Sequence, residues 1–331
     1  MQTPKKLPYG NADFKSVRTE KNYAYVDKTR FIESLENEGN KSKIFIRPRR
    51  FGKSLFLSTL AYYYDVNYAE EFERLFGDLY IGKNPTEGKN NFAVMEFDFS
   101  GVDTSNIETF RKSFFDNIRR TAWRFLDNHK NIFTDVEQFI LKMKNGEFSA
   151  LESLDLALGS AESAKIKIFM IIDEYDHFAN DLIAMGSVFG EDFYKNVVTA
   201  NGLVRDFYEK LKVAAKLGII GQTFITGISP VMLEDLTSGY NIATNYSLDL
   251  RYNEMIGFTR EEVDELMSVV GIEPNQIDVD MEYYYNGYLF NPKAENKIYN
   301  STMILYFFEQ ILKGEDLPMN LIDPNLGTDQ K

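Results

Sequence analysis

The stretch Ile44-Phe45-Ile46-Arg47-Pro48-Arg49-Arg50-Phe51-Gly52-Lys53-Ser54 decides the fold that this sequence predicts. It starts with the end of a short apolar run, which is typical of a buried strand, and Lys53 to Tyr64 then carries apolar residues at helical spacing. The loop between them ends in Gly-Lys-Ser. In this order, backbone N–H groups at the start of the helix point into the loop and bind phosphate oxygens. The stretch therefore predicts a phosphate-binding loop.

The last residues of the loop each have a role in this chemistry. Gly52 lets the backbone approach a ligand closely, Lys53 reaches the β- and γ-phosphates, and the Ser54 hydroxyl binds Mg²⁺. We therefore predict ATP and Mg²⁺ as cofactors. The residues expected to contact the nucleotide are Arg47, Pro48, Arg49, Arg50, Phe51, Gly52, Lys53, Ser54 and Leu55.

The loop departs from the usual pattern at its first position, where Arg47 replaces a glycine. Positive charge comes from Arg47, Arg49, Arg50 and Lys53. In a chain whose formal net charge is −13, this local reversal of sign favours an anion site. The alternative is a basic surface turn that contains Gly-Lys-Ser by chance.

A second apolar run, Ile166 to Ile172, ends in two adjacent carboxylates, Asp173 and Glu174. In a parallel sheet, ligands bind at this carboxyl end of the strands. We expect Asp173 to hold Mg²⁺ together with Ser54, and Glu174 to polarise the water that attacks the γ-phosphate. The alternative is an ordinary strand end that leaves the sheet for solvent. The next acidic residue, Asp176, is more typical of a solvated turn.

Thr226 ends a third apolar run, Gly218 to Gly227. Its hydroxyl is a candidate for hydrogen bonding to the attacking water or to the γ-phosphate, which makes it the third catalytic candidate beside Lys53 and Glu174. The alternative is a threonine that closes a turn at the strand end. Arg251 and Arg260 are weaker candidates for a charge directed at the γ-phosphate, because most arginines are solvated or paired at the surface.

Together these runs predict an α/β fold with a parallel sheet flanked by helices. Phe92 to Phe99 is a further strand, and long amphipathic segments separate the strands, as βαβ crossovers require. We assign residues 1–235 to this domain and residues 236–331 to a smaller, helix-rich domain that ends in a linker. In the second domain, Thr259 starts a capping box and Asn286-Gly287 is expected to form a turn.

Composition excludes several other classes of protein. The 331 residues include no cysteine and two histidines, which argues against disulfide scaffolds, thiolate metal sites and Ser-His-Asp hydrolases. The acidic balance argues against a broad nucleic-acid surface. The sequence shows no secretory signal and no apolar segment long enough to span a membrane, so we expect a cytoplasmic protein.

With these residues in hand, the sequence resembles the AAA-ATPase-like family of bacterial proteins. The resemblance rests on several further motifs. They are Leu7-Pro8-Tyr9-Gly10, Tyr25-Val26-Asp27-Lys28-Thr29, Ile172-Asp173-Glu174-Tyr175-Asp176, Phe224-Ile225-Thr226-Gly227 and Asn286-Gly287-Tyr288. The family's loop is similar to this one and also has arginine in place of the opening glycine.

The resemblance implies a P-loop NTPase core of the additional-strand type, with a sensor strand between the Walker A and Walker B strands and Thr226 near Lys53 and Glu174. Many family members continue into a PD-(D/E)XK nuclease-like domain. That domain, which would be the route to DNA as a partner, is not recognisable here, and Asp323 to Lys331 fits a chain cut just before it.

Three functions are compatible with the sequence. The first is Mg²⁺-dependent binding and hydrolysis of ATP by a module that regulates a linked or partner domain. The second is a protein that binds a nucleotide or a nucleic-acid phosphate without hydrolysis. The third is a P-loop kinase, which ranks last because adjacent Asp173 and Glu174 favour water as the acceptor. The sequence does not indicate whether the protein is a monomer or an oligomer.

Overall fold

The computed structural model describes residues 4–20, 22–178, 203–230, 240–277 and 279–314. Within these ranges, five strands form one sheet in the order β2-β3-β4-β1-β5, and every neighbouring pair is parallel. The strands are β1 (Ser42–Ile46), β2 (Ala93–Asp98), β3 (Ile168–Asp173), β4 (Ile220–Gly227) and β5 (Thr244–Asn245). This confirms the predicted α/β fold with a parallel sheet. Strand β4 lies between β1 and β3.

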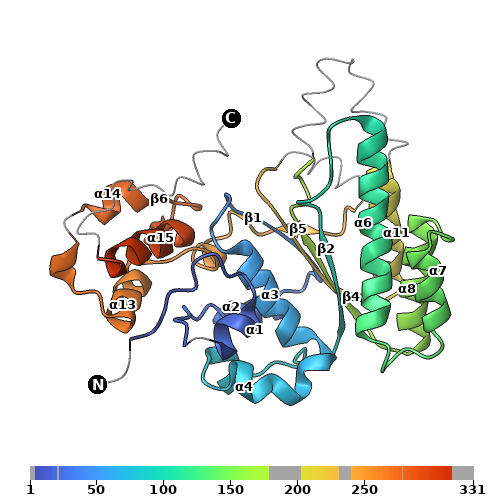
Figure 1. Ribbon diagram of the computed structural model, residues 1–331, viewed down its shortest axis with the longest axis horizontal. Helices are drawn as coiled ribbons and strands as arrows, with labels where there is room; N and C mark the ends of the chain where they lie inside the picture. Colours follow the sequence, from blue (N-terminus) through green and yellow to red (C-terminus); the bar gives the residue numbers. More distant parts are fainter. Residues whose placement is uncertain (1–3, 21, 179–202, 231–239, 278, 315–331) are drawn as a thin grey trace.

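Helices cover both faces of the sheet (Figure 1). One face packs on α1 (Phe14–Thr19), α2 (Arg30–Glu36), α3 (Lys53–Tyr64), α4 (Phe72–Phe76) and α5 (Tyr80–Lys83), with the 3₁₀ helix η1 (Val66–Glu71) between α3 and α4. The other packs on α6 (Ile107–Asn128), α7 (Glu137–Lys144), α8 (Ala150–Ser163) and α11 (Leu203–Lys216).

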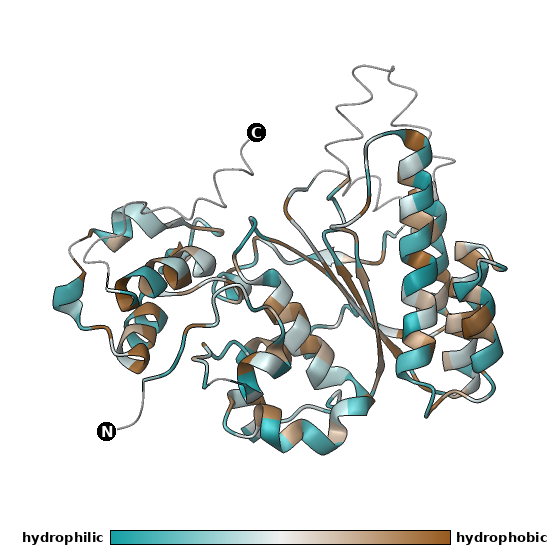
Figure 2. Ribbon diagram, in the orientation of Figure 1, coloured by the Kyte–Doolittle hydropathy of each residue, from teal (hydrophilic) through white to brown (hydrophobic). Residues whose placement is uncertain are grey.

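The strands are apolar along most of their length because they lie between these two layers of helices. In β3, Ile168 to Ile172 are all buried, and only Asp173 at its end is partly exposed. Figure 2 shows the same arrangement, with hydrophobic strands at the centre and hydrophilic faces of the helices turned outward. The hydrophobic runs read from the sequence are therefore the strands that build the carboxyl edge of the sheet.

The C-terminal elements form a separate helical group beside the sheet (Figure 1). It consists of α13 (Arg260–Val270), α14 (Met281–Tyr285), α15 (Ser301–Leu312), an antiparallel pair of β6 (Asn286–Tyr288) and β7 (Ile298–Tyr299), and the 3₁₀ helix η3 (Pro274–Gln276), while η2 (Leu250–Tyr252) precedes it. The predicted capping box is confirmed, since Thr259 and Glu262 bond reciprocally.

One local prediction in this region is wrong. Asn286 and Gly287 do not form a turn but belong to β6, directly after α14. Pairing of β6 with β7 across residues 289–297 replaces the tight hairpin that the Asn-Gly pair suggested. The predicted boundary at residues 235 and 236 and the predicted linker at 323–331 lie outside the described residues.

Segments far apart in the chain join the two groups. Strand β5 pairs with β1, so residues 244–245 extend the sheet beside the loop-bearing strand. Residues near the N-terminus, in turn, contact the C-terminal helices. The backbone N–H of Lys5 donates to Val269 O on α13 at 3.1 Å, and Ala24 is buried in the core of these helices. The start of the chain therefore helps to place the helical group.

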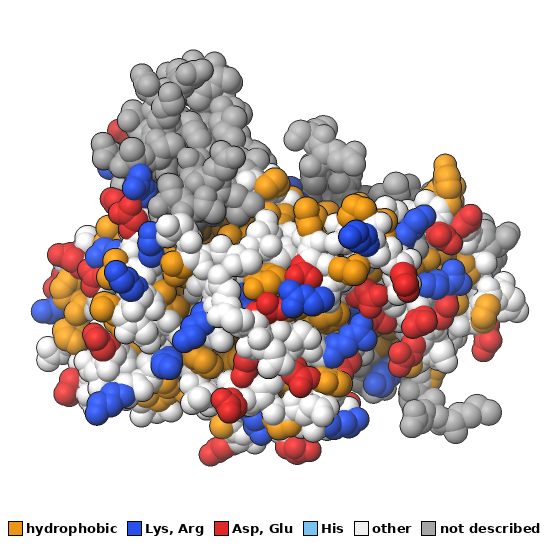
Figure 3. All heavy atoms as spheres, turned by 180° about the vertical axis from the view of Figure 1, so that it is seen from behind, with side chains coloured by type: hydrophobic (Ala, Val, Ile, Leu, Met, Phe, Trp, Pro, Cys, Tyr) orange, Lys and Arg blue, Asp and Glu red, His pale blue; other side chains and the backbone are white. Residues whose placement is uncertain are grey.

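Seen from behind, basic and acidic side chains are interspersed over the described surface, with no extended basic patch on this face (Figure 3). In the described part of the chain, none of the helices combines the length and the hydrophobicity that crossing a lipid bilayer requires.

Candidate functional site

The loop after β1 has the backbone of an anion site. The N–H of Arg47 still pairs with Gly227 O at 3.2 Å, so the loop leaves the sheet after that residue. Arg50 and Gly52 then adopt left-handed conformations, with φ of 65° and 93°, and Gly52 is the N-cap of α3. A side chain at position 52 would be strained, and its Cβ would lie 3.2 Å from Ser301 Oγ. The sequence places glycine where the turn needs it.

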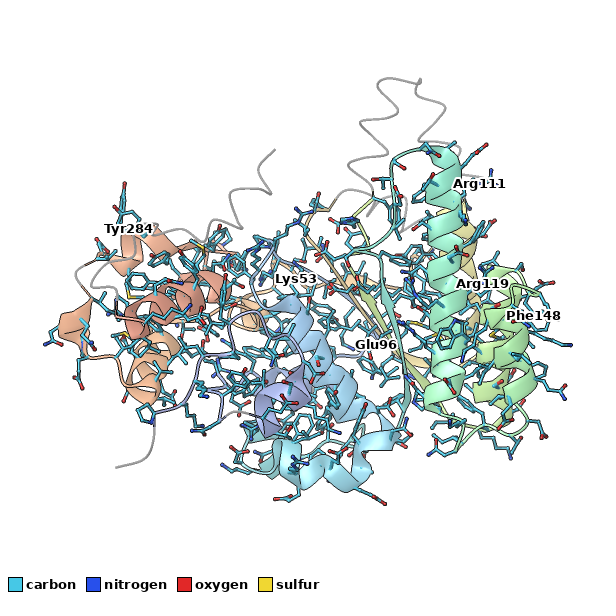
Figure 4. All side chains as sticks on the ribbon, viewed as in Figure 1. Lys53, Glu96, Arg111, Arg119, Phe148 and Tyr284 are labelled. Carbon is cyan, nitrogen blue, oxygen red and sulfur yellow. The ribbon has the colours of Figure 1, made fainter. Side chains whose placement is uncertain are left out.

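Lys53 lies inside this loop. Its ammonium group donates to Arg47 O at 3.0 Å and to Pro48 O at 3.1 Å, and the residue is 5% exposed. Burial lowers the pKa of Lys53, and the nearby carboxylates of Glu174 and Asp173 partly offset this effect. In Figure 4, Lys53 lies at the start of α3, next to the sheet.

Asp173 connects the loop to the neighbouring strands. Its Oδ2 accepts a hydrogen bond from Ser54 Oγ at 3.1 Å, and its Oδ1 accepts one from Thr226 Oγ1 at 2.5 Å. Residues from α3, β3 and β4 therefore meet at one point. Thr226 is fully buried, and its hydroxyl donates to Asp173, the residue directly before Glu174.

Glu174 follows in a strained backbone conformation, with φ of 53°. Its carboxylate lies 3.8 Å from Nδ1 of His177. Burial raises the pKa of Glu174, whereas the positive charges of Lys53 and Arg49 act in the opposite direction. Non-glycine residues in this region of φ are uncommon and occur often at functional sites.

A cavity of about 610 Å³ lies against the loop. Seven of the nine predicted nucleotide contacts line it, those of Arg49 to Leu55, and Glu174 lines it too. The opposite wall comes from the start of the chain and from the C-terminal group. These residues are Pro8, Tyr9, Gly10, Asn11, Ala12, Ala24, Tyr25, Val26, Lys28, Met255, Ile256, Gly257, Phe258, Leu266, Ser301, Thr302 and Leu305.

The side chain of Arg47 takes no part in this cavity. It is 1% exposed, it donates to Ser247 O at 2.7 Å and to Tyr252 O at 3.1 Å, and its guanidinium lies between the rings of Phe45 and Phe290. Arg47, which replaces the usual glycine, therefore anchors the loop to residues 247–252 and to Phe290. Pro48 likewise does not line the cavity.

Other candidates from the sequence have structural partners. Arg251 pairs with Glu38 and Asp249, and Arg260 pairs with Asp264, so both are engaged away from the cavity. The sequence reasoning did not single out Lys28 as a site residue. This lysine lines the cavity and donates to both carboxylate oxygens of Glu262 at 2.6–2.7 Å.

Asp176 contradicts the prediction of a solvated turn. It is 3% exposed, and its carboxylate accepts hydrogen bonds from the backbone N–H groups of Ile228 (3.1 Å) and Ser229 (2.6 Å). The chain after β4 offers unpaired donors, which a buried carboxylate satisfies. Burial nevertheless raises the pKa of Asp176.

Replacing Asp176 with alanine should destabilise the protein by about 2–3 kcal/mol, because it removes the buried acceptor of two partly buried N–H groups. Chemical denaturation of the variant and of wild type measures this difference. Asp206→Ala, at an exposed position on α11, is the control. Equal stability of the Asp176 variant and wild type would contradict this role.

A family model described as "Predicted AAA-ATPase" matches residues 8–237. The chain belongs to the predicted AAA-ATPase family. The match covers the loop, the Asp173-Glu174 strand end and Thr226, and it confirms the resemblance stated from the motifs. Membership of the predicted AAA-ATPase family supports an ATP-related activity and nucleotide binding.

A relative of this predicted AAA-ATPase is the "Uncharacterized protein in vnfD 5'region" of Azotobacter chroococcum mcd 1. The two are 26% identical over 315 residues, which are 92% of this chain and 52% of the relative. The chain therefore spans about half the length of the curated relative that it matches. The comparison with solved structures found no match.

Proposed function

We propose that this chain binds ATP together with Mg²⁺ in the cavity beside the loop and hydrolyses it. The observation that carries the proposal is the hydrogen bond between Ser54 and Asp173, which joins the start of the loop's helix to the end of a neighbouring strand. Lys53 and Glu174 line the same cavity. Together they supply a cation for phosphate, oxygen ligands and a carboxylate within one site.

The donor set fits Mg²⁺. This ion prefers hard oxygen ligands and takes one or two from the protein, with water and phosphate filling the remaining positions. Ser54 and Asp173 are the residues that would hold it. Thr226 fixes the carboxylate of Asp173 through its second oxygen, which leaves Asp173 oriented toward Ser54. When bound, the ion would neutralise charge on the phosphates.

The remaining residues account for hydrolysis. Lys53 would shift from the carbonyls of Arg47 and Pro48 to the phosphates, because a charge-assisted bond to phosphate is stronger than one to a neutral carbonyl. Glu174 would orient the attacking water and accept its proton. The raised pKa of Glu174 favours this role, since it brings the carboxylate closer to the working pH of a general base.

The finer classification is also part of the proposal. Strand β4, which ends in Thr226, lies between the loop-bearing β1 and the acidic β3, and this order supports a P-loop core of the additional-strand type. The helical group that forms one wall of the cavity would then move with the nucleotide and act on a linked or partner domain. We place this activity in the cytoplasm. The same proposal includes a nuclease-like partner domain that would bring the protein to DNA.

Titration of the full chain with ATP, with and without Mg²⁺, tests the proposal. We expect Mg²⁺ to tighten binding roughly tenfold and Ser54→Ala to remove most of that gain, because the variant lacks the hydroxyl ligand. Isothermal calorimetry measures both affinities. Ser160→Ala, whose hydroxyl bonds only within α8, should behave as wild type. Absence of ATP binding under both conditions would refute the proposed function.

A further inference from the structure

The first residues of α15 contact the phosphate-binding loop directly, although they follow it by about 250 residues. Arg50 O accepts hydrogen bonds from the backbone N–H of Thr302 at 3.2 Å and from Thr302 Oγ1 at 2.6 Å. Ser301 Oγ lies 3.4 Å from the same oxygen. Asn300, the N-cap of α15, makes a longer contact of 3.5 Å to Arg49 O. One end of α15 therefore holds two consecutive carbonyl groups of the loop.

Holding these carbonyls determines where the loop's donors point. In a planar trans peptide, the C=O of one residue and the N–H of the next point in opposite directions. Because Arg50 O points toward Thr302, the N–H of Phe51 points away from α15. By the same geometry, the Asn300 contact to Arg49 O directs the N–H of Arg50 away from α15.

Lys53 completes the pattern from the other side, since it binds the carbonyls of Arg47 and Pro48. Four consecutive carbonyl groups of the loop are thus occupied by donors. An anion site needs donors, and a carbonyl turned inward would repel phosphate. The contacts from Lys53 would be released when it binds phosphate, whereas those from α15 can persist.

A second contact ties the same loop to the C-terminal group. Phe51 is 1% exposed, and its ring packs edge to face on Tyr288 and Phe290, with ring centroids 4.7 and 5.6 Å apart. The helix α15 in turn belongs to the apolar core that it shares with α13 and α14. The conformation of the loop therefore depends on how the helical group is docked.

From this geometry we infer that Thr302 is a positioning residue for the phosphate-binding loop, and that affinity for the phosphate groups depends on docking of α15. This inference rests on the proposed function, because it assigns the loop's N–H groups to phosphate. It extends that function by making the C-terminal helices part of the anion site. Loss of the contact between Thr302 and Arg50 O would weaken binding of the triphosphate.

The test compares Thr302→Val, Thr302→Ser and wild type in the full chain. Calorimetry with inorganic triphosphate probes the loop, and adenosine probes the remainder of the cavity. Thr302→Val loses the hydroxyl donor but keeps the backbone donor, so we expect triphosphate to bind about three- to tenfold more weakly. Thr302→Ser keeps the hydroxyl and should restore the affinity. Adenosine should bind all three proteins equally.

Thr121→Val on α6, which does not line the cavity, is the matched control and should leave both affinities unchanged. Equal binding of triphosphate to Thr302→Val and wild type would overturn the inference while leaving the proposed function intact. If Thr302→Val also melts at a lower temperature, the serine variant decides: retained affinity supports the role and lost affinity overturns it. Unchanged triphosphate affinity in Lys53→Met would instead refute the proposed function.

Discussion

Replacing Lys53 with methionine should weaken ATP binding by at least about a hundredfold, the largest effect that we expect from a single substitution in this chain. The lysine is buried inside the loop and supplies the positive charge closest to its carbonyl groups. A charge-assisted hydrogen bond to phosphate in a partly desolvated site contributes several kcal/mol, of which ~1.4 kcal/mol corresponds to a factor of ten. Calorimetric titration with ATP and Mg²⁺ measures the loss.

Lys43 provides a matched control for this substitution. It is also buried, with 3% exposure, and its ammonium donates to Gln222 Oε1 at 3.0 Å, but it does not line the cavity. Lys43→Met therefore removes a similar buried charge from the same strand-loop-helix unit. It should keep the ATP affinity of wild type. Equal losses in the two variants would mean that the effect of Lys53→Met reflects general destabilisation and not contact with phosphate.

The second large effect concerns turnover. Glu174→Gln should bind ATP as tightly as wild type, or more tightly, and should lower the rate of phosphate release by about 10²–10³. Glutamine keeps the shape of the side chain but cannot accept a proton from water. Measurement of phosphate release at saturating ATP, combined with calorimetry, separates the rate from the affinity.

The pH profile gives a second check on Glu174. Only the ionised carboxylate can act as a base, so the rate should fall as pH drops through its pKa. Because burial raises the pKa of Glu174, this fall should begin above the ordinary range for glutamate, which is about 4.3. The acidic limb should be missing in the residual activity of Glu174→Gln.

Glu96→Gln is the control for Glu174→Gln, because it also removes a carboxylate but does so in the sheet, on β2. Glu96 is on β2 and points to the same side of the sheet as Asp173, but it is not part of the cavity wall. Replacing Glu96 with glutamine should leave turnover unchanged. Figure 4 labels both Glu96 and Lys53. If wild type binds ATP but releases no phosphate above the level of Glu174→Gln, the chain is a nucleotide-binding protein without hydrolysis.

Much of the fold was predictable because its signals are local. The helical spacing after Lys53 ends at Tyr64 in both sequence and structure, and the apolar run before Asp173 is a strand buried on both faces. The capping box at Thr259 is likewise a short-range pattern that few other structures satisfy. The helical spacing and the capping box depend on neighbours within one or two turns, so distant packing does not alter them.

The errors arise where distant segments decide the outcome. The sequence predicts that Asp176 lies in a solvated turn. It does lie in a turn, but it is buried and accepts hydrogen bonds from backbone N–H groups some fifty positions later. Asn286-Gly287 has the composition of a tight turn, yet pairing with β7 takes it into a strand. Arg47 was counted among the charges of the anion site, whereas carbonyls of Ser247 and Tyr252 draw its guanidinium away from it.

Only one side of the candidate site could be predicted from the sequence, because distant segments form the other side. The loop, Asp173 and Glu174 carry recognisable motifs, and the structure brings Ser54 and Asp173 into contact. Residues of the motifs Leu7-Pro8-Tyr9-Gly10 and Tyr25-Val26-Asp27-Lys28-Thr29 line the opposite wall, but the sequence assigned them no role in the site. Thr302 follows an ordinary helix cap in sequence, and its contact with Arg50 O cannot be read from spacing.

The buried environment of Arg47 limits how far residues 44–55 can be regarded as a portable cassette. If this peptide were grafted into another sheet, its sequence would be unchanged. Its Arg47 would lose the contacts with the carbonyls of Ser247 and Tyr252 and with the ring of Phe290. Restoring glycine at position 47 would be no simpler, since it would vacate the space between two aromatic rings. A protein engineer who wishes to reuse this binding element would have to transplant its surroundings with it.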